Sequence, residues 1–212
     1  MDNQFEEIGS VSREEIFQRS RIVKNPSYDV ALGLLKGGEY FVGQVKVKFN
    51  IFDPILEDVF LDYKGREVKY LVVNGKELKP GVVNNDAIFR HHRIYLPKEL
   101  LIVGTQKNEI FISFVSNYVR DCQGIHYYFD KEDNSEYLYS QFESVDAHIC
   151  FPCFDQPDLK APYTLLTCAP KLWNVISTCE EIKNAKELKE VHENGFTKSL
   201  PDSQQLTTEV IC

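Results

Sequence analysis

The chain has 212 residues, 43% of them hydrophobic and 26% charged, as is typical of one soluble globular domain with or without appendages. Its net charge of −8, without any basic cluster, argues against a nucleic-acid partner. No stretch approaches the roughly 18 apolar residues of a membrane-spanning helix. The acidic first residues lack the basic-then-apolar order of a signal peptide. The sequence therefore predicts a cytoplasmic protein with no membrane partner.

The first predicted element is a helix over residues 10–23. Ser12 followed three residues later by Glu15 has the signature of a capping box, and a modest apolar stripe follows it. We assign residues 1–24 to an N-terminal arm that carries this short helix. Residues 25–212 are assigned to a β-domain against which the arm lies.

From Tyr28 onward the apolar period changes to two, which predicts strands. Residues 28–35 and 40–52 read as a hairpin with one buried face, and Asn74-Gly75 between apolar runs is a strong hairpin signal. The other predicted strands are residues 59–63, 68–73, 88–96, 109–119, 125–129, 163–168, 175–179, 196–198 and 206–211. Residues 98–104 and 180–190 are each compatible with a short helix or a loop. Many short strands with almost no helix predict an all-β fold, a β-sandwich or open barrel of mostly antiparallel strands.

Residues 137–173 form a polar and proline-rich block between two apolar runs. Three prolines, Pro152, Pro157 and Pro162, fall within twelve residues and exclude a regular helix. We therefore expect a rigid, irregular connection between strands. Just upstream, Gln141 and Glu143 are two residues apart, so in an extended chain they share one face.

This block resembles the M1 family of zinc aminopeptidases, in particular the soluble, bacterial-type aminopeptidase N branch. The likeness is carried by Tyr137-Leu138-Tyr139-Ser140-Gln141-Phe142-Glu143, Asp146-Ala147, Phe151 to Ala161, Ala169-Pro170 and Trp173 to Ser177. Shorter matches in the family's order, such as Val73-Asn74-Gly75, extend it over about residues 10–212. The matching region is the family's N-terminal β-domain. The resemblance thus implies a saddle-like fold and an M1 catalytic domain as partner.

The resemblance also implies roles for individual residues. Glu143 would bind the free α-ammonium group at the peptide N-terminus of the substrate, and Gln141 would line the pocket for the first side chain. A carboxylate that must face an ammonium group rejects blocked termini, because these would leave it unpaired. Asp155, Asp158 and Lys160 are expected to be structural residues of the proline-rich connection.

The family's zinc site is not recognisable in this sequence. The family binds zinc through H-E-x-x-H and a distant Glu, but His192-Glu193 is followed by Phe196 where the second His belongs. Met1 is the only methionine, which excludes the family's Gly-x-Met-Glu-Asn segment. We therefore expect no zinc in this chain, zinc in the full-length enzyme, and no peptidase activity from the chain alone. The apparent strand at residues 206–212 suggests an aminopeptidase truncated before its catalytic domain.

The remaining histidines and the cysteines leave two other functions open. His91 and His92 are neighbours on a predicted strand and would face opposite ways, whereas His126 and His148 read as isolated surface or core residues. Cys150 and Cys153 form a C-x-x-C, which fits either a redox or metal protein or two small core residues. The second of these other functions is a stand-alone β-sandwich interaction module without catalysis.

Overall fold

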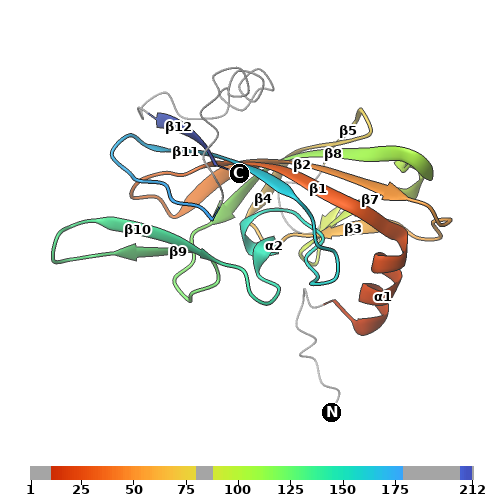
Figure 1. Ribbon diagram of the computed structural model, residues 1–212, viewed down its shortest axis with the longest axis horizontal. Coiled ribbons are helices and arrows are strands. Elements are labelled where there is room, and N and C mark those ends of the chain that lie inside the picture. Colours follow the sequence, from red (N-terminus) through yellow and green to blue (C-terminus); the bar gives the residue numbers. More distant parts are fainter. Residues whose placement is uncertain (1–10, 80–87, 179–205, 212) are drawn as a thin grey trace, which may run out of the picture.

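The computed structural model describes residues 11–79 and 88–178, together with the backbone of residues 206–211 (Figure 1). Its elements are α1 (Arg13–Ile22), β1 (Val23–Gly33), β2 (Tyr40–Ile51), β3 (Val59–Asp62), β4 (Glu67–Val73), β5 (Lys76–Leu78), β6 (Phe89–Arg90), β7 (Arg93–Leu96), the 3-10 helix η1 (Lys98–Leu100), β8 (Gly104–Asn117), β9 (Gly124–Phe129), β10 (Glu136–Gln141), α2 (Ala147–Cys150), β11 (Tyr163–Pro170) and β12 (Leu206–Ile211). The predicted all-β class with a short N-terminal helix is confirmed.

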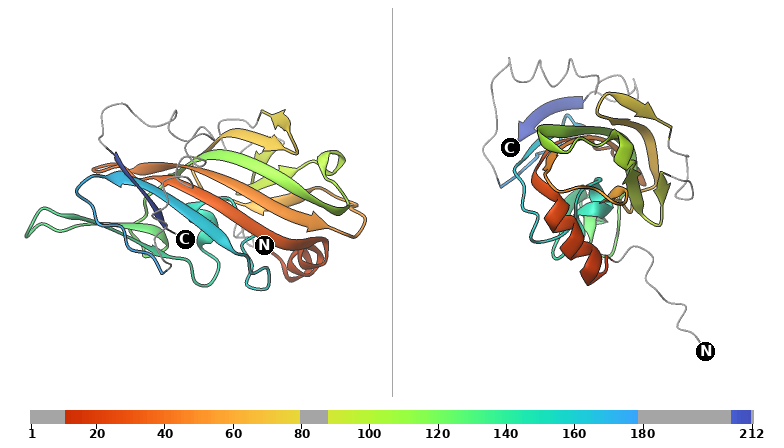
Figure 2. Two further views of the ribbon diagram at one scale, coloured as in Figure 1. Left: turned by 45° about the horizontal axis from the view of Figure 1, so that its top comes forward. Right: turned by 90° about the vertical axis from the view of Figure 1, so that its right-hand side faces the viewer.

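The strands form one large sheet and two small ones. The seven-stranded sheet has the order β12-β11-β1-β2-β8-β4-β5, and all its neighbours are antiparallel except β1 and β11. β3, β7 and β6 form a three-stranded sheet, and β9 and β10 form a hairpin. The large sheet curves without closing into a barrel, as Figure 2 shows. The β9–β10 hairpin projects from one end of the molecule, and α1 lies near the other end (Figure 1).

The period-two alternation predicted the buried face of β2 correctly. Val45, Val47, Phe49 and Ile51 are fully buried. Ile110, Ile112 and Phe114 of β8 are fully buried too. Tyr63, which follows β3, packs its ring 5.5 Å from that of Phe114 and donates a 2.6 Å hydrogen bond to the Val115 carbonyl. The small β3–β7–β6 sheet is thereby joined to the core of the large one.

Two hairpin turns illustrate one correct prediction and one wrong prediction. Asn74 and Gly75 have φ of 49° and 82° and connect β4 to β5 as expected. Residues 88–96, however, are not one strand, because His91 and His92 have φ of 52° and 58° and form the turn between β6 and β7. The two histidines are therefore turn residues. The turn lacks the Asn-Gly or Asp-Gly pair that signals a two-residue hairpin, although histidine, like Asn and Asp, adopts positive φ more often than most residues.

The capping box of α1 is confirmed. The Ser12 hydroxyl accepts a hydrogen bond from the Glu15 amide at 3.2 Å, and the Ser12 amide donates to the Glu15 carboxylate at 2.8 Å. The helix ends at Ile22 and β1 begins at Val23, so the predicted arm runs directly into the large sheet.

Glu15 gives the helix a pH-dependent attachment. Burial raises its pKa, but hydrogen bonds from Arg93 and Ser12 outweigh burial and lower the pKa to about 2 from a usual 4.5. The ionised Glu15 carboxylate therefore stabilises the folded state fully above pH 4.5, and this stabilisation is lost as the pH falls towards 2. The side chain is 34% exposed, so solvent screening limits its contribution to roughly 0.5–1 kcal/mol.

We expect Glu15→Gln to lower the free energy of unfolding by about 0.5–1 kcal/mol at pH 7 and by progressively less as the pH falls through 4. Glutamine retains a partner for the capping box, so the change isolates the charge. Urea unfolding of both proteins at several pH values measures the difference. An equal difference at pH 7 and pH 3 would contradict the assignment.

The C-terminal part of the strand prediction is confirmed only in part. Residues 163–168 lie in β11, and residues 206–211 form β12 beside it. Residues 175–178 are irregular rather than a strand, and Ile176 is 92% exposed. The predictions for residues 180–190 and 196–198 lie outside the described residues. In the part of the chain that is described, no helix is both long and apolar enough to span a membrane.

Candidate functional site

The two predicted site residues lie where the β9–β10 hairpin returns to the body of the domain. Gln141 is the last residue of β10 and pairs with Gly124, and Glu143 lies in the turn that follows. Both side chains are exposed, whereas Phe142 between them is half-buried and packs its ring 6.3 Å from that of Phe151. Among the described residues, neither Gln141 nor Glu143 has a side-chain hydrogen bond or ion pair. Both polar groups are thus available to a ligand.

The turn that carries Glu143 is attached to the core. The Asp146 amide donates to the Phe142 carbonyl at 3.0 Å, and α2 begins immediately afterwards. The carbonyl of Cys150, at the end of α2, accepts a 2.9 Å hydrogen bond from the buried Ser116 hydroxyl of β8. Gly124, opposite Gln141, has φ of 55°, and a Cβ there would lie 2.8 Å from the Ile149 side chain. The position of the two site residues is therefore determined by buried contacts.

A groove of about 1230 Å³ runs beside this turn. Its lining includes Val30, Leu32 and Leu34 of β1, residues 136–140 of β10, and much of the proline-rich connection. Phe142 and Ser144 contribute to the lining, but Gln141 and Glu143 do not. The predicted site residues therefore lie next to the groove and are open to solvent.

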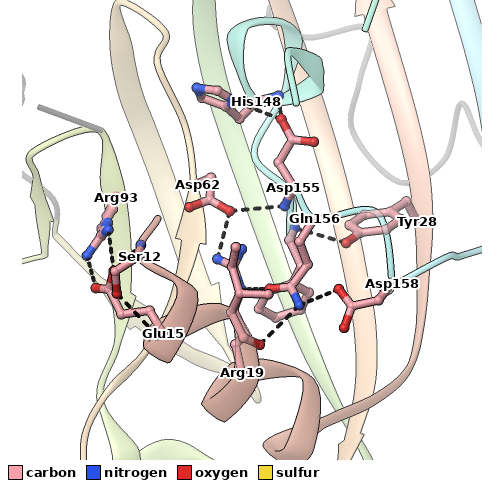
Figure 3. A network of polar contacts seen from close by, with 12 residues as sticks. Ser12, Glu15, Arg19, Tyr28, Asp62, Arg93, His148, Asp155, Gln156 and Asp158 are labelled. Carbon is pink, nitrogen blue, oxygen red and sulfur yellow. Dashed lines mark hydrogen bonds and ion pairs between the residues drawn. The ribbon is translucent and has the colours of Figure 1, made fainter. Parts of the chain in front are cut away.

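A buried ion pair joins α1 to β3, and the proline-rich connection is attached to it (Figure 3). A guanidinium nitrogen of Arg19 lies 2.7 Å from the Asp62 carboxylate, and the two side chains are 3% and 5% exposed. The same carboxylate accepts a 3.0 Å hydrogen bond from the Asp155 amide. Burial raises the pKa of Asp62, and the charge of Arg19 opposes that shift. The Asp155 carboxylate accepts a hydrogen bond from the backbone amide of His148 at 2.9 Å. The same carboxylate lies 2.7 Å from the ring Nδ1 of His148.

Gln156 completes the network between the connection and α1. Its carbonyl oxygen accepts from Arg19 Nε at 2.5 Å, and its amide nitrogen donates to Asp158 at 2.8 Å and to the Ile16 carbonyl at 3.3 Å. Asp155 and Asp158 therefore hold the connection in shape, while Lys160 is exposed. No sequence motif indicates that Arg19 is buried. Its spacing is a weak signal, because Arg19 lies three residues after Ile16 and four before Val23 and so shares the helical face of these apolar residues.

Cys150 and Cys153 have the properties of core residues. Both are free thiols and are 1% and 4% exposed. Burial raises the pKa of each thiol, which keeps it protonated and unreactive. The backbone of Cys153 also pairs with that of Asp62 through two hydrogen bonds of 2.8 and 3.1 Å. These observations favour two packed core thiols over a redox or metal centre.

Within residues 11–79 and 88–178, no group of three or more His, Cys, Asp or Glu side chains is arranged to hold a metal ion. The ring Nδ1 of His148 contacts the Asp155 carboxylate at 2.7 Å, and the ring Nδ1 of His126 accepts a hydrogen bond from the Cys122 amide at 3.0 Å. His192, Glu193 and Phe196 lie outside the described residues. Zinc ligands are therefore not found in the described part of this chain.

Comparison with known proteins yields one family and several relatives. The family model described as Peptidase M1 N-terminal domain matches residues 24–206. Aminopeptidase N of Streptomyces lividans is 33% identical over 171 residues, which cover 79% of this chain and 19% of the relative. Probable M1 family aminopeptidase 1 of Encephalitozoon cuniculi is 28% identical over 173 residues, with the same coverage. The chain thus spans about a fifth of the length of these curated relatives.

Among solved structures, the fold is similar to that of native yeast LTA4 hydrolase. The TM-score is 0.61 at 14% sequence identity, and the match covers 91% of this chain and 27% of that chain. At this identity the likeness concerns the fold alone.

Proposed function

The chain belongs to the peptidase M1 N-terminal domain family, and on that premise we propose that it forms the substrate-cleft domain of an M1 metallo-aminopeptidase, which removes N-terminal amino acids from peptides. In this proposal the domain supplies two contacts to the substrate and leaves the bond cleavage to a catalytic domain. The observation that carries it is a pair of exposed polar side chains without a side-chain partner among the described residues: Gln141 at the end of β10 and Glu143 on the following turn, which is attached to the core.

Glu143 is proposed to anchor the α-ammonium group of the substrate. A carboxylate facing an ammonium group forms a charge-assisted hydrogen bond, about twice as strong as a neutral one. When a catalytic domain covers the turn, water is displaced and the interaction strengthens, because the local dielectric falls. An acylated or internal peptide nitrogen carries no charge and would leave the buried carboxylate unpaired. This asymmetry restricts cleavage to the first residue of the peptide.

Gln141 is proposed to contact the first side chain of the substrate. It ends β10 next to the anchor, and its amide group can both donate and accept hydrogen bonds. Such a neutral group adjusts to different side chains. We expect it to affect the preference among substrates more than the overall rate.

Zinc is not assigned to this domain, because its described residues provide no suitable group of ligands. We assign the zinc, and with it the polarisation of the scissile carbonyl, to the catalytic domain of the complete enzyme. The buried free thiols Cys150 and Cys153 fit a reducing compartment, so we also propose a cytoplasmic location.

A chimaera tests the function directly. Residues 24–206 replace the matched residues of Streptomyces lividans aminopeptidase N, and cleavage of an aminoacyl amide is compared with that of its N-acetyl derivative. We expect the chimaera to bind zinc and to cleave only the free-amine substrate. A chimaera that binds zinc and cleaves both substrates equally would refute the anchoring role of the domain.

In the same chimaera, we expect Gln141→Ala to change the relative kcat/KM among alanyl, leucyl and phenylalanyl amides by about two- to tenfold. The loss of one hydrogen bond between neutral groups corresponds to roughly 0.5–1.5 kcal/mol. Steady-state kinetics with the three substrates measures the ratios, and Ser140→Ala on the same strand is the control. A uniform loss across all three substrates would exclude a role of Gln141 in side-chain preference.

A further inference from the structure

The outward face of the β9–β10 hairpin is lined with aromatic rings. Tyr137, Tyr139 and Gln141 are alternate residues of β10 and so share a face. The two tyrosines are 49% and 47% exposed. The intervening Leu138 packs against the core, opposite the buried Tyr127 of β9. The inner face of the hairpin thus provides its attachment, and the outer aromatic face is left open.

One pair of rings on this face is fixed in position. Tyr139 lies opposite His126 in the strand register, and their rings are stacked with centroids 4.6 Å apart. The Tyr139 hydroxyl lies 3.4 Å from the Cys122 sulfur, and the Cys122 amide donates to His126 Nδ1 at 3.0 Å. Both rings are therefore held by the short segment before β9. A flat, pre-oriented surface results, although the Tyr139 side chain remains half exposed.

We propose that the Tyr139–His126 stack forms the far wall of the pocket for the first side chain and selects substrates with large, flat first residues. The inference rests on the proposed function, because it takes Glu143 as the amine anchor and Gln141 as the first pocket residue. In β10 the order of residues from the anchor is then Gln141 followed by Tyr139. A side chain that leaves the α-carbon near Glu143 and passes Gln141 reaches the Tyr139 ring only if it is long.

The chemistry of the stack favours an aromatic partner. Aromatic rings pair in offset or edge-to-face arrangements that add to the burial of apolar area. Tyr139 and His126 already hold each other, so little side-chain freedom is lost when a third ring packs on them. An alanyl substrate is too short to make this contact. We therefore expect the stack to raise kcat/KM for phenylalanyl substrates more than for alanyl substrates.

The experiment measures the ratio of kcat/KM for phenylalanine amide to that for alanine amide in the chimaera with the Streptomyces lividans enzyme. We expect Tyr139→Ala to reduce this ratio about three- to tenfold, the range given by aromatic pair energies, and Tyr139→Phe to retain it because the ring remains. Tyr137→Ala is the matched control. It removes an equally exposed tyrosine from the same face, one step farther from Gln141. An unchanged ratio in Tyr139→Ala, or an equal loss in Tyr137→Ala, would overturn the proposal.

A second measurement needs no catalysis. In the 15N-labelled chain, phenylalanine amide is expected to shift the backbone amide signals of His126 and Tyr139, and alanine amide to leave them unchanged. The absence of a difference between the two amides would also overturn the proposal.

The experiments distinguish failure of the Glu143 anchor from failure of the Tyr139–His126 wall. If Glu143→Ala has no effect but the Tyr139-dependent ratio persists, the anchor is wrong; if anchoring is intact but the ratio is insensitive to Tyr139, the aromatic wall is wrong.

Discussion

Replacement of Arg19 by alanine is expected to lower the free energy of unfolding by about 3–5 kcal/mol. The guanidinium and the Asp62 carboxylate are 3% and 5% exposed and lie 2.7 Å apart. Removal of one partner leaves the other charge buried without compensation, which costs far more than the pair contributes. Arg19 also contacts Gln156 and lies 4.8 Å from the centroid of the Phe60 ring. The loss therefore also affects the attachment of α1 to the proline-rich connection.

Urea unfolding followed by circular dichroism measures this effect, with Arg21→Ala as the matched control. Arg21 belongs to the same helix but is exposed, so its loss should cost no more than about 0.5 kcal/mol. The double variant Arg19→Met, Asp62→Asn removes both charges and should be less destabilised than Arg19→Ala. If Arg19→Ala were as stable as Arg21→Ala, the buried ion pair would not hold the arm.

Glu143→Ala in the chimaera is expected to reduce kcat/KM for free-amine substrates about ten- to a hundredfold. A hydrogen bond to a charged group contributes roughly 1.5–3 kcal/mol, which corresponds to this range. The zinc content should stay normal, because Glu143 belongs to no metal-binding group among the described residues. Since Glu143 is exposed in this chain and has no described partner, its removal should not change the free energy of unfolding measurably.

Kinetics with free and N-acetylated substrates, together with metal analysis, checks the expectation. Glu132→Ala, an exposed carboxylate at the tip of the same hairpin, is the control for the loss of one negative charge. The effects of Glu143→Ala and Gln141→Ala should not add, because the two residues serve one pocket. Unchanged cleavage of free-amine substrates by Glu143→Ala would leave Glu143 as an ordinary polar turn residue.

The period-two pattern predicted the orientation of one candidate site residue but not the local structure of the other. The period of two correctly placed Gln141 on an exposed face of β10 and turned Phe142 inward. It did not predict that Glu143 lies beyond the strand, in a turn. That turn results from the packing of Phe142 on Phe151 and from the Asp146–Phe142 hydrogen bond. Neither contact is encoded in local periodicity.

The sequence by itself determined the elements whose cause is local. Alternation predicted the buried face of β2, a capping box predicted the start of α1, and Asn74-Gly75 predicted its turn, because each depends on residues a few positions apart. Only the tertiary structure decided the turn at His91 and His92, the irregular path of residues 175–178 and the burial of Arg19. Arg19 is buried because Asp62 and Gln156, distant in the sequence, compensate its charge. Such compensation follows from which strands lie side by side, and short-range patterns carry no information about it.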